Sequence, residues 1–260
     1  MRGAAQALLL PAPARRGSHT ARAFAALLIA AGALMLADAG VTLVWQEPIS
    51  ALYATLRQQS LGGELHALDR AKPSAAAAQV LERLREERLR IAYLASALEQ
   101  RAGAGSAVGR NRIPAIGASF VVVKGTGTSE LESGPGIYPQ TRFPGIGGTT
   151  AIAGHRTTYL APFRHIDALR PGERIVLEMP YGRFTYTVTG SRVVLPNHVS
   201  VIEPAGYPRL VLSACTPLFS ASHRIVVFAR LTSTVPLGAA RLATRRRASR
   251  RSPMMLEAFQ

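Results

Sequence analysis

Hydrophobic and polar positions follow three different patterns along the chain. A continuous apolar stretch, residues 23–45, comes after a basic segment, residues 1–22. Residues 46–101 then place leucine and isoleucine at roughly helical spacing among glutamate and arginine, which predicts helices. From residue 112 to residue 231, short β-branched runs alternate with Gly/Pro turns, a pattern typical of strands. The sequence therefore predicts an apolar span, a helical segment and an all-β domain.

The apolar stretch 23–45 is long enough to cross a bilayer as a helix. Asp38 lies toward its outer end, where a carboxylate costs less than at the bilayer centre, and Trp45 closes it as interfacial aromatics do. The basic residues of segment 1–22 precede it, which predicts a cytoplasmic N-terminus and an extracellular remainder. A cleaved signal peptide is the alternative, but its apolar region is usually about 7–15 residues and ends in a small-x-small site.

The helical segment contains a break at Pro73 and the alanine run 75–78. Three glycines (Gly103, Gly105 and Gly109) then indicate a flexible linker. We predict a helical stalk and linker over residues 46–110. The stalk is either a plain spacer or a coil that self-associates.

The all-β domain is predicted over residues 111–231, as a compact barrel or sandwich. Its strand-like runs are residues 119–124, 149–153, 174–179, 184–194, 210–215 and 224–231. One helix-like piece, residues 161–169, interrupts them. The remaining residues, 232–260, are polar and basic and are predicted to form a disordered tail.

Net charge and cysteine content narrow the possible partners. The 260-residue chain carries a formal net charge of +16, which could indicate nucleic acid binding. The charge lies mostly in the two tails and the helical segment, so we predict no nucleic acid partner.

A single cysteine has no internal disulfide partner. Acidic residues of the β domain are too scattered for a calcium cage, and we predict no metal and no cofactor.

Three reactive side chains stand at the ends of predicted strands. Cys215 ends one apolar run, His155 follows another in an Ala-Gly-His-Arg context, and Arg224 opens a third. A thiol, an imidazole and a guanidinium in such positions suggest thiol-dependent acyl transfer, with nucleophile, general acid–base and oxyanion donor in that order. The alternatives are a small buried thiol, a turn histidine and a surface charge at a strand end.

The domain from Arg112 to Leu231 resembles the sortases, most closely the class E type of high-GC Gram-positive bacteria. Three blocks in the family's order carry the resemblance. The first is Ile-Pro-Ala-Ile at 113–116, and the third is Val-Leu-Ser-Ala-Cys at 211–215 followed by Arg224. The second block contains Gly-Ile-Tyr-Pro at 136–139, Ala-Gly-His-Arg-Thr-Thr-Tyr at 153–159 and Ala-Pro-Phe at 161–163. Val211 and Ala214 replace the threonines of the family's Thr-Leu-x-Thr-Cys motif.

The resemblance implies a fold, a site and a reaction. The fold is an all-β, eight-stranded sortase-type barrel preceded by a transmembrane helix and a helical stalk. The expected catalytic residues are His155, Cys215 and Arg224, and Tyr138 and Ala214 are expected to contact substrate. The family cleaves sorting signals of Leu-x-x-Thr-Gly type between threonine and glycine through a thioester, and class E members favour Leu-Ala-x-Thr-Gly.

The expected partners are secreted proteins that carry a sorting signal, an amine acceptor on a cell-wall precursor or a protein, and the membrane. Two other functions use the same sequence features. A cysteine peptidase would hydrolyse the thioester instead of transferring it, and a stalked extracellular module would only bind peptide. An L,D-transpeptidase expects Ser-His-Gly-Cys around its cysteine, which Cys215 lacks. No lid motif precedes the barrel between Gly103 and Arg112, which favours wall attachment over pilus assembly.

Overall fold

The computed structural model describes residues 19–44 and 48–241, and the chain divides into two compact units, Met1–Trp45 and Gln46–Gln260. The first unit holds helix α1 (His19–Val44), whose apolar window has a mean hydropathy of 1.9 and no side chain buried within the protein. At 1.5 Å per residue the helix is about 39 Å long, enough for the hydrocarbon core of a bilayer. It is compatible with a single membrane span.

Three regions that the sequence analysis assigned lie outside the described residues. They are Trp45, most of the basic segment 1–22, and residues 242–260 of the predicted tail. The prediction of a disordered tail from residue 232 is wrong at its start, because residues 232–236 belong to the last strand of the chain, His223–Pro236.

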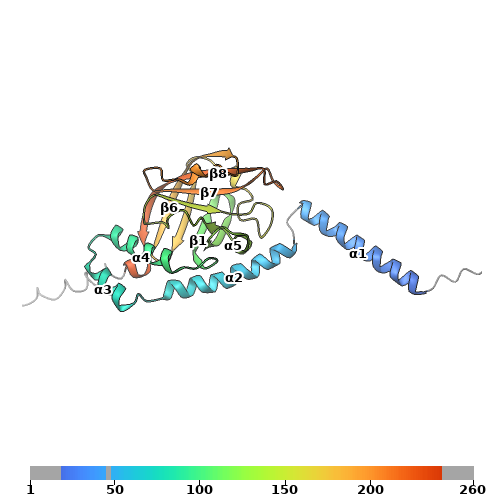
Figure 1. Cartoon of the computed structure of the whole chain (residues 1–260), viewed down its shortest axis with the longest axis horizontal. Coiled ribbons are helices and arrows are strands. Elements are labelled where there is room, and N and C mark those ends of the chain that lie inside the picture. Colours follow the sequence, from blue (N-terminus) through green and yellow to red (C-terminus); the bar gives the residue numbers. More distant parts are fainter. Residues whose placement is uncertain (1–18, 45–47, 242–260) are drawn as a thin grey trace, which may run out of the picture. The chain divides into compact units, whose positions relative to one another are not determined.

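The second unit is built on a closed barrel of eight strands, in the spatial order β1-β2-β3-β4-β7-β8-β6-β5 (Figure 1). The strands are β1 (Ala107–Ile113), β2 (Ala118–Lys124), β3 (Gly136–Ile137), β4 (Thr149–Ala153), β5 (Arg174–Met179), β6 (Gly182–Val194), β7 (Arg209–Thr216) and β8 (His223–Pro236). Two neighbouring pairs, β2 with β3 and β4 with β7, run parallel, and the others run antiparallel. The predicted eight-stranded barrel is confirmed.

The connections contain one short helix, α5 (Thr128–Ser133), and three 3-10 turns: η1 (Pro114–Ile116), η2 (Ile166–Ala168) and η3 (Val199–Ile202). The Ile-Pro-Ala-Ile motif at 113–116 begins with the last residue of β1, and Pro114, which lacks a backbone donor, starts the turn η1. One local prediction needs correction. The helix-like piece 161–169 has regular helical structure only at η2.

The barrel interior follows the period-two alternation of its strands. On β7, Leu210, Leu212 and Ala214 point into the main core, and Val211 belongs to a separate apolar cluster on the outer face. That outer cluster is covered in part by Val201 and Ile202 of the connection between β6 and β7. Alternation on β7 therefore assigns Cys215 to the outer face.

Helices α2 (Pro48–Arg70), α3 (Ala75–Arg83) and α4 (Glu87–Arg101) precede the barrel, and two of them pack on it. Leu61 and Leu65 of α2 form a buried cluster with Ala107 of β1 and with Val121 and Val123 of β2. Figure 1 shows α2 running along the barrel beneath β1 and α5.

Helix α4 supplies Ile91, Ala95 and Leu98 to the main core. The break predicted at Pro73 lies between α2 and α3, where Ser74 caps the second helix by accepting a hydrogen bond from the amide of Ala77. The helical segment is thus part of the folded unit, and the barrel core continues into it.

Candidate active site

Cys215 and Arg224 face each other across two adjacent strands. The antiparallel register of β7 and β8 pairs Cys215 directly with Arg224, and no bulge interrupts this ladder. Direct partners in an antiparallel pair project to the same side of the sheet. Both residues are half-buried. The strand pairing therefore brings thiol and guanidinium to one place on the outer face of the barrel.

His155 is held beside the same end of β7 by its two neighbours. The parallel register of β4 and β7 pairs Ala153 with Ser213, and the amide of Gly154 donates to the Ser213 carbonyl at 3.1 Å. Nη1 of Arg156 donates to the Cys215 carbonyl at 3.5 Å. The residues on both sides of His155 are thus bonded to the backbone of residues 213 and 215. The structure therefore places the backbone of His155 beside the end of β7 that carries Cys215, whose strand partner is Arg224.

Gly154 is required by close packing beneath the histidine. A Cβ atom at this position would lie 2.6 Å from the ring of Phe163, which is fully buried. The amide of Phe163 donates to the carbonyl of His155 at 3.0 Å, so the chain turns back on itself between these two residues. The Gly-His pair of the sequence is therefore explained by an aromatic ring that occupies the space of a side chain.

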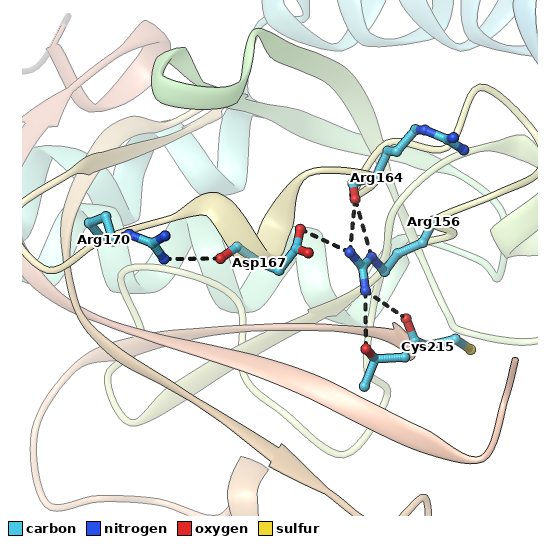
Figure 2. A network of polar contacts seen from close by, with 6 residues as sticks. Arg156, Arg164, Asp167, Arg170 and Cys215 are labelled. Atoms are coloured by element: carbon cyan, nitrogen blue, oxygen red, sulfur yellow. Dashed lines mark hydrogen bonds and ion pairs between the residues drawn. The ribbon is translucent and has the colours of Figure 1, made fainter. Parts of the chain in front are cut away.

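Arg156 ties the histidine loop to β7 through a buried guanidinium (Figure 2). The residue is only 4% exposed, and its Nη1 also donates to Thr216 Oγ1 at 3.2 Å. Its Nε and Nη2 donate to the carbonyl of Arg164, and Nη2 forms an ion pair with Asp167 at 2.9 Å. In Figure 2 the sulfur of Cys215 lies on the side away from this guanidinium. Arg156 is therefore structural.

The surroundings of His155 favour the neutral imidazole. Burial lowers the pKa of His155 below its ordinary value of 6.5, and the negative charge of Glu132 opposes this effect in part. Within the described part of the chain, its buried Nε2 atom has no hydrogen-bond partner. An unpartnered ring nitrogen of low basicity at a half-buried position is suited to exchange a proton with a substrate.

Arg224 is oriented by carbonyl groups of its own turn. Its Nη1 donates to the carbonyl of Ala221 at 2.9 Å and to that of His223 at 3.1 Å. Among residues 19–44 and 48–241, no partner is found for its Nε and Nη2 groups. These donors remain for an oxygen bound near Cys215.

The two predicted substrate contacts occupy different environments. Tyr138 is half-buried and packs against the outer-face cluster that contains Val211. Ala214 is 3% exposed and belongs to the barrel core, on the face of β7 opposite to Cys215. A substrate on the outer face can contact Tyr138, whereas the side chain of Ala214 is enclosed by the barrel.

The sequence analysis did not select Tyr159 and Glu132 as site residues. The Tyr159 ring lies against the His155 imidazole with 5.3 Å between centroids, and its hydroxyl donates to Glu132 Oε1 at 3.0 Å. The two residues are 27 positions apart, and no local pattern indicates that they meet.

Two cavities of about 470 and 570 Å³ lie away from this site, and neither is lined by His155, Cys215 or Arg224. In the described residues, no three metal-ligating side chains cluster.

Comparison with known proteins identifies relatives of the barrel. Residues 112–232 match the model of the sortase domain family. The chain is 31% identical over 130 residues to Sortase D of Bacillus subtilis, covering 48% of this chain and 64% of the relative. It is 34% identical over 98 residues to Sortase SrtE1 of Streptomyces coelicolor, covering 34% of this chain and 28% of the relative. The chain thus spans less than two thirds of either relative.

A solved structure agrees with these matches. The SrtF sortase from Corynebacterium diphtheriae is similar to this chain with a TM-score of 0.50 and 27% sequence identity. The similarity covers 52% of this chain and 89% of that protein. The residues that match the family model, 112–232, include the three candidate residues.

Proposed function

Because the chain belongs to the sortase family of cysteine transpeptidases, we propose that it is a membrane-anchored transpeptidase that cleaves sorting signals of Leu-Pro-x-Thr-Gly or Leu-Ala-x-Thr-Gly type. Cleavage occurs between threonine and glycine, and the substrate protein is transferred to an amine. The match to Sortase SrtE1 supports the class E resemblance, and hence the alanine-containing signal. The observation that carries the proposal is the direct strand pairing of Cys215 with Arg224, together with the hydrogen bonds by which the two neighbours of His155 attach its loop to β7.

The first half of the reaction forms a thioester. The thiolate of Cys215 attacks the threonine carbonyl carbon, and the carbonyl π electrons move onto oxygen. Arg224 donates to this oxyanion, because its guanidinium lies on the same face as the sulfur. His155, as the imidazolium, gives its proton to the glycine nitrogen as the carbon–nitrogen bond breaks. The products are a thioester on Cys215 and a free glycine amine.

The second half of the reaction transfers the acyl group. An amine attacks the thioester carbon while neutral His155 takes its proton, and Arg224 again stabilises the oxyanion. Collapse of the tetrahedral intermediate expels the Cys215 thiolate and leaves a new amide bond. The enzyme returns to its starting state, with imidazolium at His155 and thiolate at Cys215.

The imidazolium form of His155 is a minor one at neutral pH, because burial lowers its pKa below the ordinary value of 6.5. His155 therefore has to take up a proton before it can protonate the leaving glycine amine.

Tyr138 is the substrate contact that the structure leaves accessible. Its ring packs on the outer-face cluster that contains Val211. Val211 lies on the same strand as Cys215 and points to the same outer face. We assign it a role in reading the residues that precede threonine in the signal. Ala214 is left out of this role because the barrel encloses it.

Helix α1 is assigned the role of a single-pass anchor. Its length and mean hydropathy suit a bilayer span, and the arginines that precede it favour a cytoplasmic N-terminus. The barrel then works outside the cell, where secreted substrates and cell-wall amines meet.

A peptide assay tests the proposal. The full chain in detergent is incubated with a Leu-Ala-x-Thr-Gly peptide, with and without an added oligoglycine amine, and products are identified by mass spectrometry. We expect an amine adduct at threonine that is absent with Cys215→Ala. Hydrolysed product alone at every amine concentration identifies a peptidase. Peptide binding with no cleavage by the wild-type chain identifies a binding module.

A further inference from the structure

The loop that follows His155 contains a strained stretch. Tyr159, Leu160 and Ala161 have φ angles of 50°, 64° and 41°, so three consecutive non-glycine residues adopt left-handed backbone. Such residues persist only where surrounding contacts hold them, and they concentrate at functional sites. The contacts of Tyr159 therefore show what this loop is shaped to do.

Tyr159 connects the histidine to a carboxylate on another element. Its ring is tilted by 37° against the His155 imidazole at a centroid distance of 5.3 Å. Its hydroxyl donates to Oε1 of Glu132, on α5, at 3.0 Å. A hydrogen bond to a carboxylate is stronger than one between neutral groups, so the direction of the ring is well determined.

Helix α2 supports both ends of this connection. On one side, Ser50 Oγ accepts a hydrogen bond from the Tyr159 amide at 3.4 Å, and the Tyr53 ring meets the Tyr159 ring edge-on at 6.3 Å. On the other side, Gln58 Nε2 donates to the carbonyl of Ser133 at 2.8 Å. The side chain of Ser133, next to Glu132, is further bonded by Arg57 Nε at 3.3 Å.

We propose that Tyr159 and Glu132 are positioning residues for His155, with Glu132 fixing the direction of the Tyr159 ring and the ring fixing the plane of the imidazole. The proposal rests on the acid–base role assigned to His155 above. It explains the strained loop, because the left-handed backbone at Tyr159 places this side chain in contact with both His155 and Glu132. Helix α2 then serves as the support of the acid–base group in addition to covering the barrel.

The charged and titratable groups around His155 come from four elements. Glu132 lies on α5, Cys215 on β7, Arg224 on β8, and Arg156 and Tyr159 on the loop of His155 itself. Of these, the charge of Glu132 is the one that raises the pKa of His155 against the effect of burial. Neutralising Glu132 therefore lowers the pKa of His155 further and makes imidazolium scarcer.

Kinetics of the full chain in detergent provide the first test. We expect Glu132→Gln and Tyr159→Phe each to lower kcat by roughly tenfold, the equivalent of one charge-assisted hydrogen bond, with little change in KM. Glu130→Gln, on the same helix, is the matched control and retains wild-type kcat. In Glu132→Gln the acidic limb of the pH profile of kcat/KM shifts to lower pH. In Tyr159→Phe the main change is the drop in kcat.

An NMR titration of His155 provides a test that does not depend on activity. It uses the full-length Cys215→Ala chain with labelled histidine, in which the thiol cannot titrate. We expect Glu132→Gln to lower the imidazole pKa, and both variants to change the ring shifts. Wild-type kcat together with an unchanged His155 titration in both variants overturns the proposal. If the wild-type chain cleaves no peptide, the proposed function fails, and the titration still decides the positioning role.

Discussion

Cys215 and Arg224 are direct cross-strand partners on β7 and β8. Partners of this kind have Cβ atoms about 4.5–5.5 Å apart and project to one side of the sheet. An oxyanion formed on the carbon that the sulfur attacks therefore lies within reach of the guanidinium. The pairing of the two residues is set by strand register, and the carbonyls of Ala221 and His223 further orient the Arg224 guanidinium.

Replacing Arg224 tests its role as oxyanion donor. We expect Arg224→Ala to lower kcat for peptide cleavage by about 10²–10³-fold, or about 2.7–4 kcal/mol of barrier. Arg224→Lys recovers little, because an ammonium lacks the planar fork of the guanidinium. Arg230→Ala, on the same strand, is the control, since Arg230 stacks on Tyr207 at 4.3 Å. A kcat in Arg224→Ala close to that of the control excludes the role.

The buried His155 makes stability depend on pH. Burial lowers the pKa of His155 in the folded state, so below about pH 6.5 the unfolded chain binds a proton that the folded chain does not. The free energy of unfolding therefore falls as pH drops through this range. Urea unfolding at several pH values should show a shallower decrease for His155→Gln than for the wild type. Identical pH dependence in the two proteins contradicts the assignment.

The glycine before the histidine is sterically required. In Gly154→Ala the new methyl group meets the Phe163 ring at 2.6 Å, and we expect a loss of about 1–3 kcal/mol from overpacking. Activity also falls, because His155 is the next residue. Gly190→Ala has open space around it and serves as the control for thermal unfolding. Adding Phe163→Leu to Gly154→Ala should recover part of the activity, and no recovery at all argues against the steric cause.

Arg156 and Asp167 form an ion pair whose two members differ in burial. Arg156→Met leaves the carbonyls of Arg164 and Cys215 without their donor, and we expect a loss of about 1–3 kcal/mol. The Asp167 side chain is 56% exposed, so Asp167→Asn should cost less than about 1 kcal/mol. Urea unfolding measures both. Equal losses in the two variants contradict the view that backbone carbonyls are the main partners of Arg156.

The helices before the barrel are predicted to be necessary for its stability. A fragment of residues 107–241 exposes the surfaces that Leu61 and Ile91 cover, and each buried aliphatic side chain contributes about 1.5–3 kcal/mol. We expect this fragment to aggregate or to unfold at a lower temperature than the fragment 48–241. Thermal unfolding followed by circular dichroism compares them. Equal melting temperatures show that the barrel needs no support from α2 and α4.

Local patterns were sufficient for most of the barrel. Strands such as β4 and β7 carry β-branched runs between Gly/Pro turns, so they could be predicted. Strand β1 was not predicted, because it contains glycine, asparagine and two arginines in seven residues. Strand β3 was not predicted, because two residues are too few to form a pattern.

For the site, the sequence could indicate the residues at strand ends but not their supports. His155, Cys215 and Arg224 stand out by chemistry and by position next to apolar runs. The contact of Tyr159 with Glu132 depends on the path of the loop and on α2, which no short-range spacing reveals. Likewise, helical periodicity in residues 46–101 predicts an apolar face, but it does not say whether that face meets a barrel or another helix.

The unbroken ladder between β7 and β8 has a consequence for misfolded forms of the protein. Neighbouring positions on a strand point to opposite sides, so slipping β7 by a single residue turns Cys215 toward the barrel interior and Ala214 toward the outer face. The sulfur would then be sealed among aliphatic groups and out of reach of any reagent. Labelling of the thiol by a maleimide in the cold thus counts the molecules that have aligned this hairpin correctly.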